Sequence, residues 1–266
     1  MTSSNDTNAS SLLLNPEEPP AVEIINAEGS SNTVLLCDHA SNLVPRRLNN
    51  LGLKPKQLAE HIAWDPGAAV VARGLSSCLD APLVLSSYSR LVIDCNRSPL
   101  NTKSIAEQSA GVSIPGNQGL SQEQRASRRR ELFEPYHLAI SKLLDDRSQL
   151  NTLLLSIHSF TPVLDGLRRP WPIGVCYGHD RRLAMLMLKA LAGSVDGEVG
   201  DNQPYAIEDT IDYTIPLHGE GRGLPSVMIE IRQDQIRTAA EAANWTAQLV
   251  DAWLQIEAEA QRLQVQ

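Results

Sequence analysis

Three apolar segments of strand length each end in a residue that can bind a metal ion or transfer a proton. The segment "LLCDHASN" supplies Asp38 and His39, "LLLSIHSF" supplies His158, and "SVMIEIRQD" supplies Glu230. Two histidines and a carboxylate are the usual protein ligands of a catalytic zinc ion. A partly buried carboxylate near activated water can act as a general base and then as a general acid. The alternatives are structural: hydrogen-bonded histidines at strand ends and an ion pair between Glu230 and Arg232 or another arginine.

The segment "YSRLVIDCNR", residues 88–97, places charged and amide side chains in a run that otherwise reads as a buried strand. Strand side chains alternate between faces, so the even-numbered positions from Arg90 to Asn96 are expected to share one face. Arg97, supported by Asn96, suits two parallel hydrogen bonds to a substrate carboxylate. Arg90 could stabilise an oxyanion, with Asp94 orienting an arginine. The alternative is a buried ion pair that braces the sheet.

The elements that must position these residues form an alternating series. Short apolar runs predict strands at "TVLLC", "APLVLS", "RLVIDC", "TLLLSI", "PIGVCY" and "PSVMIEI", and periodic patterns predict helices over about 67–79, 121–148, 180–194 and 235–262. Alternation of this kind indicates an α/β sandwich with a mixed, largely parallel sheet. We expect a polar, mobile lead-in over residues 1–20 and a single domain over 21–266.

Two long polar loops, about 98–120 and 196–223, separate the predicted elements. In open α/β sheets, ligands bind beyond the carboxyl ends of the strands, where such loops meet. Tyr213, His218 and Arg222 lie on the second loop and could close over a substrate or contact its acyl end. Ordinary loop polarity is the alternative explanation for these three residues.

Bulk properties narrow the class of protein. The chain has 266 residues, with 23 basic and 31 acidic side chains and a net charge of −8. This balance argues against general affinity for nucleic acid or an anionic membrane, although a local basic pocket could still bind anions. The four cysteines are scattered singly, and the N-terminus has no basic and apolar signal, so we expect a cytoplasmic protein. The apolar spacing of the last helix suits packing on its own domain or on a second copy of the chain.

Six motifs in order resemble the N-formylglutamate amidohydrolase family, particularly a less characterised branch. They are "CDHASNLVP", "HIAWDPGA", "YSRLVIDCNR", "IHSFTP", "GEGRGLP" and "IEIRQD", within about residues 33–250. The family is similar to the zinc carboxypeptidases and to the aspartoacylase and succinylglutamate desuccinylase group. The resemblance therefore implies a three-layer, zinc-carboxypeptidase-like fold. It also implies zinc-dependent cleavage of an N-acyl amino acid, with formate and glutamate as the products from N-formyl-L-glutamate.

The resemblance also implies roles for individual residues. His39 and His158 match the metal histidines, and Glu230 matches the catalytic glutamate. Asn96 with Arg97 matches the pair that grips the substrate's α-carboxylate, while Arg90 falls at the position of the oxyanion arginine. One zinc ion per chain is expected.

The third metal ligand departs from the pattern of the carboxypeptidase-like relatives. They have a glutamate three residues after the first histidine, where this chain has Asn42. Asp65 is the first candidate for the missing ligand, because a carboxylate oxygen suits zinc, and Asp38 and Asn42 are the fallbacks. Asp65 could instead cap a helix ahead of Pro66.

Two other functions remain open at this point. One is a deacylase or carboxypeptidase that acts on a different N-acyl amino acid or on a peptide. The other is a protein that binds carboxylates through Asn96 and Arg97 without turnover, because Asn42 weakens the metal site.

Overall fold

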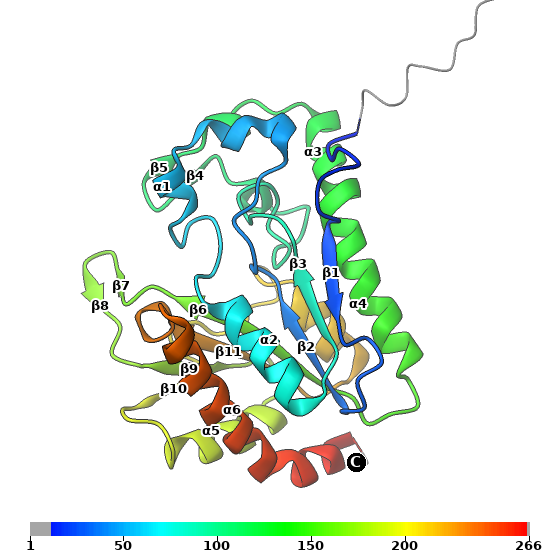
Figure 1. Ribbon diagram of the computed structural model, residues 1–266, viewed down its shortest axis with the longest axis vertical. Helices are drawn as coiled ribbons and strands as arrows, with labels where there is room; N and C mark the ends of the chain where they lie inside the picture. The colour runs from blue at the N-terminus through cyan, green and yellow to red at the C-terminus, as the bar shows by residue number, and fades with distance from the viewer. Residues whose placement is uncertain (1–11, 265–266) are drawn as a thin grey trace, which may run out of the picture.

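A seven-stranded sheet forms the centre of the computed structural model, which describes residues 12–264 (Figure 1). The strand order is β1-β3-β2-β6-β11-β9-β10. Strands β3, β2, β6 and β11 are mutually parallel, while β1, β9 and β10 run in the opposite direction. The bounds are β1 (Val22–Ile25), β2 (Thr33–Cys37), β3 (Leu83–Ser86), β6 (Leu153–Phe160), β9 (Ile173–Cys176), β10 (Val199–Asp201) and β11 (Ser226–Arg232).

Helices cover both faces of this sheet. Helices α2 (Ala68–Leu79), α5 (Arg182–Ala192) and α6 (Ala239–Ala260) pack on one face, and α4 (Glu134–Asp146) packs on the other. Alternate strand residues serve the two layers, as the period of two requires: Leu35 faces the α2 side, whereas Leu36 faces α4. The predicted α/β fold with a mixed, largely parallel sheet between helices is therefore confirmed.

The remaining elements lie in the connections. Helix α1 spans Pro55–Leu58 and α3 spans Gln122–Arg128; β4 (Gln108–Ser109) pairs with β5 (Val112–Ser113), and β7 (Val163–Leu164) pairs with β8 (Leu167–Arg168). Ser121 starts α3 through a capping box with Gln124, and a π turn over Arg129–Phe133 joins α3 to α4. Helix α1, β4, β5 and α3 lie beyond the carboxyl ends of β2 and β3, in the upper half of Figure 1, whereas the β7–β8 hairpin projects at its left edge. A second apolar cluster packs among the upper connections and includes Leu51, Tyr88, Ile93, Ile114 and Phe133.

Segment 88–97 corrects one prediction, because β3 ends at Ser86 and the following residues form turns. The backbone of this segment bonds to its own polar side chains. Ser89 Oγ accepts from the N–H of Leu91 at 3.2 Å, and Asp94 Oδ1 accepts from the N–H of Asn96 at 2.9 Å. Such local bonds compete with a strand ladder, so the apolar alternation does not produce a strand here. Strands β1 and β10 were not predicted.

The N-terminal region is only partly described. Residues 1–11 of the predicted lead-in lie outside the described residues. Leu13 is buried, and its N–H donates to both carboxylate oxygens of Glu131 at 2.9 and 2.7 Å. Among residues 12–264, the helices are all too short or too polar to cross a membrane.

Candidate active site

Two histidines and an aspartate meet at the carboxyl ends of β2 and β6. His158 Nδ1 lies 2.9 Å from Asp65 Oδ2, and His39 Nδ1 lies 3.3 Å from the same oxygen. All three side chains are buried, and their donor atoms lie within 4.8 Å of one another. The two imidazole rings meet edge to face, with centroids 5.0 Å apart. The structure thus brings together the two predicted histidines and the first candidate for the third ligand.

The outer nitrogen of each histidine faces a second carboxylate. His39 Nε2 lies 2.7 Å from Asp94 Oδ1, and His158 Nε2 lies 2.9 Å from Asp38 Oδ2. A neutral imidazole that donates its Nε2 proton to a carboxylate keeps a lone pair on Nδ1. Both lone pairs would then point toward the Asp65 carboxylate. Because lone pairs and a negative carboxylate repel one another, this arrangement is stable when a cation lies between them. Histidine ligands of zinc are usually held by carboxylates in this way, so the donor set fits a zinc ion.

Asp38, a fallback for the third ligand, instead supports His158 from behind. Its Oδ1 accepts hydrogen bonds from Thr214 Oγ1 at 2.6 Å and Tyr136 Oη at 3.0 Å. Asn42, the other fallback, donates its side-chain N–H to the carbonyl of Leu58 at 3.0 Å. Of the three candidates, the geometry favours Asp65. Although burial acts to raise it, the neighbouring histidines hold the pKa of Asp65 well below its usual value.

A tight turn delivers Asp65 to the site. The residue at the N-cap of α2 is Gly67, without a side-chain capping bond, so Asp65 does not cap this helix. Gly67 has a φ of +84°, and an added Cβ would lie 2.5 Å from the carbonyl oxygen of Ile236. Only glycine fits there without strain, and the turn leaves the Asp65 carboxylate facing His39 and His158.

Glu230 lies on β11, opposite His158 in the parallel register. Its side chain is buried, and Oε2 has no hydrogen-bond partner within the described part of the chain. Burial raises the pKa of Glu230 to about 7. Arg232, the predicted alternative partner, donates to Asp234 at 2.7 Å and to the backbone carbonyls of residues 169–171. A carboxyl group that titrates near neutral pH suits general acid–base chemistry.

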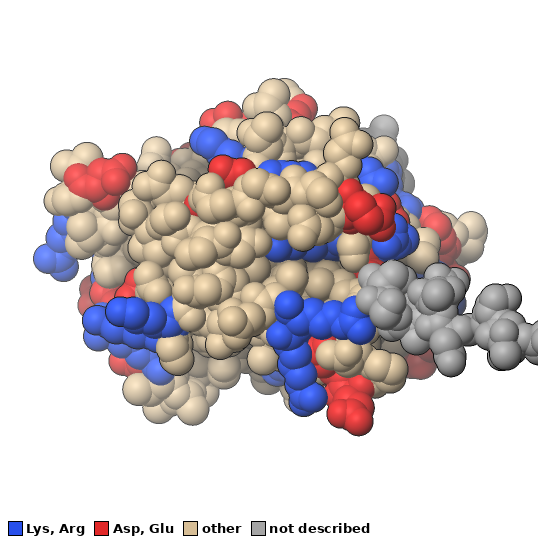
Figure 2. Space-filling view, turned by 90° about the horizontal axis from the view of Figure 1, so that it is seen from above, with Lys and Arg blue, Asp and Glu red and all other residues tan. Residues whose placement is uncertain are grey.

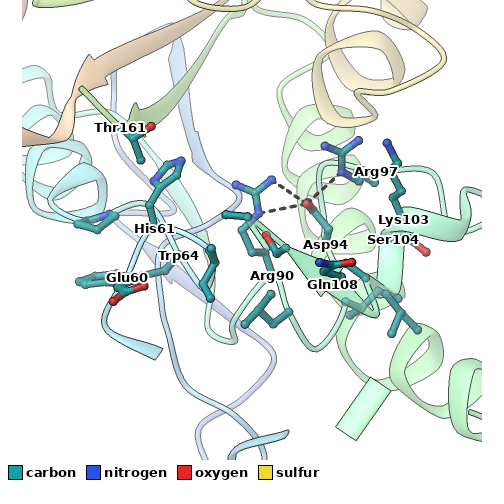
Figure 3. A pocket seen from close by; sticks show the side chains of 18 of the residues that line it. Glu60, His61, Trp64, Arg90, Asp94, Arg97, Lys103, Ser104, Gln108 and Thr161 are labelled. Atoms are coloured by element: carbon teal, nitrogen blue, oxygen red, sulfur yellow. Dashed lines mark hydrogen bonds and ion pairs between the residues drawn. The ribbon is translucent and has the colours of Figure 1, made fainter. Parts of the chain in front are cut away.

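Arg90 and Arg97 both contact Asp94 at the floor of a cleft (Figure 3). Arg90 Nη2 lies 2.8 Å from Asp94 Oδ2, and its Nη1 lies 3.5 Å from Asp65 Oδ1. Arg97 Nε lies 3.4 Å from Asp94 Oδ2. Asp94 therefore orients two cleft arginines on one side and His39 on the other.

The structure uses Asn96 to hold a loop. Its side-chain oxygen accepts from the N–H groups of Tyr213 and Thr214 at 3.1 and 3.0 Å, and its N–H donates to Asp212 at 3.0 Å. Tyr213 packs its ring 5.2 Å from that of Phe133. Neither Asn96 nor Tyr213 lines the cleft in the part of the chain that the structure describes.

The other two loop residues predicted for the substrate also have partners away from the cleft. His218 is buried, and its Nε2 lies 2.9 Å from His137 Nδ1. Arg222 forms an ion pair of 2.6 Å with Asp145 near the surface. Neither residue lines the cleft within residues 12–264.

A buried arginine that the sequence reasoning missed fixes segment 88–97 in place. Arg128 donates to the carbonyl of Val92 at 2.9 Å, to Asn117 Oδ1 at 2.6 Å and to the carbonyl of Gly116 at 3.0 Å. Asn117 in turn donates to the carbonyl of Leu91 at 2.8 Å. We call this set of hydrogen bonds from Arg128 and Asn117 the clamp. Its only signal in the sequence is that Arg128 lies four residues before the buried Leu132 and so shares its helical face.

The cleft concentrates positive charge. It has a volume of about 1890 Å³ and is lined by six basic residues, namely Arg90, Arg97, Lys103, Arg125, Arg129 and Arg237. Only three acidic residues, Glu60, Asp94 and Glu107, line it. Acidic and basic side chains are interspersed on the face shown in Figure 2, and the whole chain carries a net charge of −8. The cleft is therefore a local site for anions on an acidic protein.

The fold and this site define an α/β protein whose reactive groups gather at the carboxyl ends of parallel strands. The chain belongs to the N-formylglutamate amidohydrolase family, whose model matches residues 31–237. The predicted family is thus confirmed, and with it the amidohydrolase class.

Solved structures agree with this assignment. The structure of gene product Atu2144 from Agrobacterium tumefaciens is 37% identical, with a TM-score of 0.87, over 92% of this chain and 99% of that one. An N-formylglutamate amidohydrolase from Ralstonia eutropha JMP134 shares the fold at 16% identity, with a TM-score of 0.63 and the same coverage. A search of curated proteins finds no match.

Proposed function

We propose that this chain is a metal-dependent amidohydrolase that cleaves N-formyl-L-glutamate to formate and glutamate. The observation that carries the proposal is the convergence of His39 Nδ1 and His158 Nδ1 on Asp65, beside Glu230, whose Oε2 has no hydrogen-bond partner among residues 12–264. Membership of the N-formylglutamate amidohydrolase family supports the reaction class. A small molecule is the proposed partner, and the four free cysteines suit the reducing cytoplasm.

His39, His158 and Asp65 are the proposed ligands of one zinc ion. Bound zinc would lower the pKa of a water molecule and polarise the carbonyl of the amide. Asp94 and Asp38 hold the two imidazole rings so that each keeps its Nδ1 lone pair directed at the site. The zinc-carboxypeptidase-like description of the fold stays a prediction that this ligand set would support.

Glu230 is the proposed general base and general acid. Its carboxylate takes a proton from the attacking water and returns a proton to the departing amine nitrogen. It is buried, and its Oε2 has no hydrogen-bond partner in the described part of the chain, which leaves this oxygen available for both transfers.

Two arginines are proposed to hold the substrate. Arg90 donates to the carbonyl oxygen as negative charge develops there, and Arg97 binds the α-carboxylate. Both line the cleft and are oriented by Asp94. Asn96 is proposed to hold residues 212–214 and not the substrate, since its amide atoms already have backbone and carboxylate partners.

The test is direct assay of the purified chain with N-formyl-L-glutamate after zinc has been supplied. We expect formate and glutamate in equal amounts, loss of turnover on treatment with a chelator, and recovery when zinc is added back. Absence of both products from the zinc-supplied protein would contradict the proposed reaction.

A further inference from the structure

The cleft extends to both sides of the site. Arg90 and Asp94 lie at its centre in Figure 3. Arg97, Lys103, Ser104 and Gln108 line one arm, and Glu60, His61, Trp64 and Thr161 lie on the opposite side. Pockets for drug-sized ligands usually occupy roughly 300–1,000 Å³, so a cleft of 1890 Å³ exceeds what N-formylglutamate would fill.

The basic arm sets the direction of the substrate. Arg97 and Lys103 present positive charge there, and Lys103 has no ion-pair partner among residues 12–264. Carboxylates of the amino-acid portion therefore belong in this arm. Because the amide carbonyl lies at Arg90, the acyl group on its other side points into the opposite arm.

That opposite side combines the polar side chains of Glu60, His61 and Thr161 with apolar surface, beginning with Trp64. Ile62 and Leu164 line the cleft within three residues of these positions, and Val70 and Ile236 line it where both contact Gly67. Val70 is 52% exposed and Leu164 is 44% exposed, so both retain apolar surface that a ligand can cover. A formyl group has only a hydrogen atom beyond the carbonyl carbon and would leave this surface in contact with water. Burial of apolar surface is favourable, so a longer acyl chain gains affinity here.

We infer that this arm is an acyl-binding subsite, and that the chain hydrolyses N-acyl acidic amino acids whose acyl group is an apolar chain of several carbons. Water adds its oxygen to the acyl carbon as the C–N bond breaks, and the nitrogen gains a proton. The products are a free carboxylic acid and the amino acid. The inference rests on the proposed amidohydrolase function and specifies its substrate class.

The test compares N-formyl-, N-acetyl-, N-butyryl- and N-hexanoyl-L-glutamate as substrates of the zinc-supplied protein. Each buried methylene contributes roughly a fourfold gain, so we expect kcat/KM to be at least tenfold higher for the hexanoyl than for the formyl compound. Hydrolysis of N-formylglutamate with kcat/KM falling as the chain lengthens would overturn the inference while leaving the proposed function intact.

Val70→Asp and Leu164→Asp place a charge in the arm at exposed positions, so the charge can stay in contact with water. We expect each to lower the hexanoyl-to-formyl ratio of kcat/KM at least tenfold. Leu138→Asp on α4 is the matched control, since Leu138 is 70% exposed and lies outside the cleft lining; its ratio should equal that of the parent protein. An unchanged ratio in both arm variants would overturn the inference.

Calorimetry with Glu230→Gln separates binding from turnover. We expect N-hexanoylglutamate to bind this variant more tightly than N-formylglutamate, and Val70→Asp to remove the difference. Tighter binding of the hexanoyl compound with no hydrolysis of any of the four compounds would support the acyl-binding subsite but contradict both the proposed function and the inferred hydrolysis. Equal binding of the two compounds would count against the subsite.

Discussion

The strand ends and segment 88–97 hold their functional side chains by different means. His158 and Glu230 lie on neighbouring parallel strands, whose backbone ladder fixes their spacing and places both on the face covered by α4. Arg90 and Arg97 lie on turns, and their segment is fixed by side chains from elsewhere, above all Arg128. A ladder positions a residue through many backbone bonds, whereas a clamp relies on a few side-chain bonds. Substitutions at the strand ends should therefore lower activity without unfolding the protein. Substitutions that release segment 88–97 should lower stability and activity together.

The largest expected effect is on the strand side. Glu230→Gln should lower kcat about 10³-fold, because the general base is removed while shape is kept. Since Oε2 has no hydrogen-bond partner among residues 12–264, the melting temperature should not fall. Steady-state kinetics and thermal denaturation check the two results. A variant that keeps more than a tenth of the parent kcat would remove Glu230 from the proposed mechanism.

Arg128→Met tests the clamp. It leaves the carbonyls of Val92 and Gly116 without their donor, so we expect the free energy of unfolding to fall by about 3 kcal/mol and kcat to fall with it. Denaturant titration measures the first effect. Arg130→Met is the matched control two residues further on, in the π turn, because Arg130 is half exposed and its one ion pair among residues 12–264 is with Glu123; its cost should stay below about 1 kcal/mol. Equal losses in the two variants would refute the clamp.

A buried histidine pair makes the loop region sensitive to acid. His137 Nε2 donates to the carbonyl of Cys95, which leaves Nδ1 to accept from His218 Nε2. Burial lowers the pKa of His137 to about 4 and that of His218 to about 3. Below pH 6.5 the histidines of the unfolded chain bind protons that the buried pair does not bind. The stability contributed by burying the two neutral rings is therefore fully present above pH 6.5 and is lost as the pH falls toward 4.

His218→Gln removes one of the two groups. When the pH is lowered from 6.5 to 4.5, its free energy of unfolding should fall by about 2 kcal/mol less than that of the parent protein. Denaturant titrations at both pH values give the difference. His179→Gln is the control, because this histidine is exposed; it should keep the parent pH dependence. The same pH dependence in the parent and in His218→Gln would rule out the pair as the source.

Lys103→Ala gives the smallest expected effect, since Lys103 is exposed at the edge of the basic arm. We expect kcat/KM for N-formylglutamate to fall about fivefold, with little change for N-formylglutamine, because only the former has a side-chain carboxylate. High salt should reduce the difference. Lys142→Ala, on α4 away from the cleft lining, is the control. Equal losses on both substrates would show that Lys103 does not interact with the side-chain carboxylate of the substrate.

Sequence reasoning succeeded where local pattern and sheet topology coincide. His158 and Glu230 lie near the carboxyl ends of β6 and β11, and His39 follows the carboxyl end of β2. The parallel pairing of these strands brings the three residues together. The reasoning identified Asp65 as a candidate, but its approach to the histidines depends on the turn at Gly67 and on Ile236, far along the chain.

Segment 88–97 shows what local pattern misses. Its alternation of apolar and polar residues predicted a strand, while its hydrogen bonds make turns. Asn96 has the residue type of a substrate ligand, yet its partners come from residues more than a hundred positions away. Arg128 binds backbone carbonyls, which carry no sequence signature. Contacts of this kind follow only from the assembled fold.

Metal content is the most direct test of the central claim that His39, His158 and Asp65 form a zinc site. Elemental analysis after zinc is supplied at neutral pH should find one zinc per chain in the parent protein and in Glu230→Gln. It should find almost none in His158→Ala or Asp65→Ala. A parent protein without zinc, or an Asp65→Ala variant that binds zinc as tightly as the parent, would contradict the account.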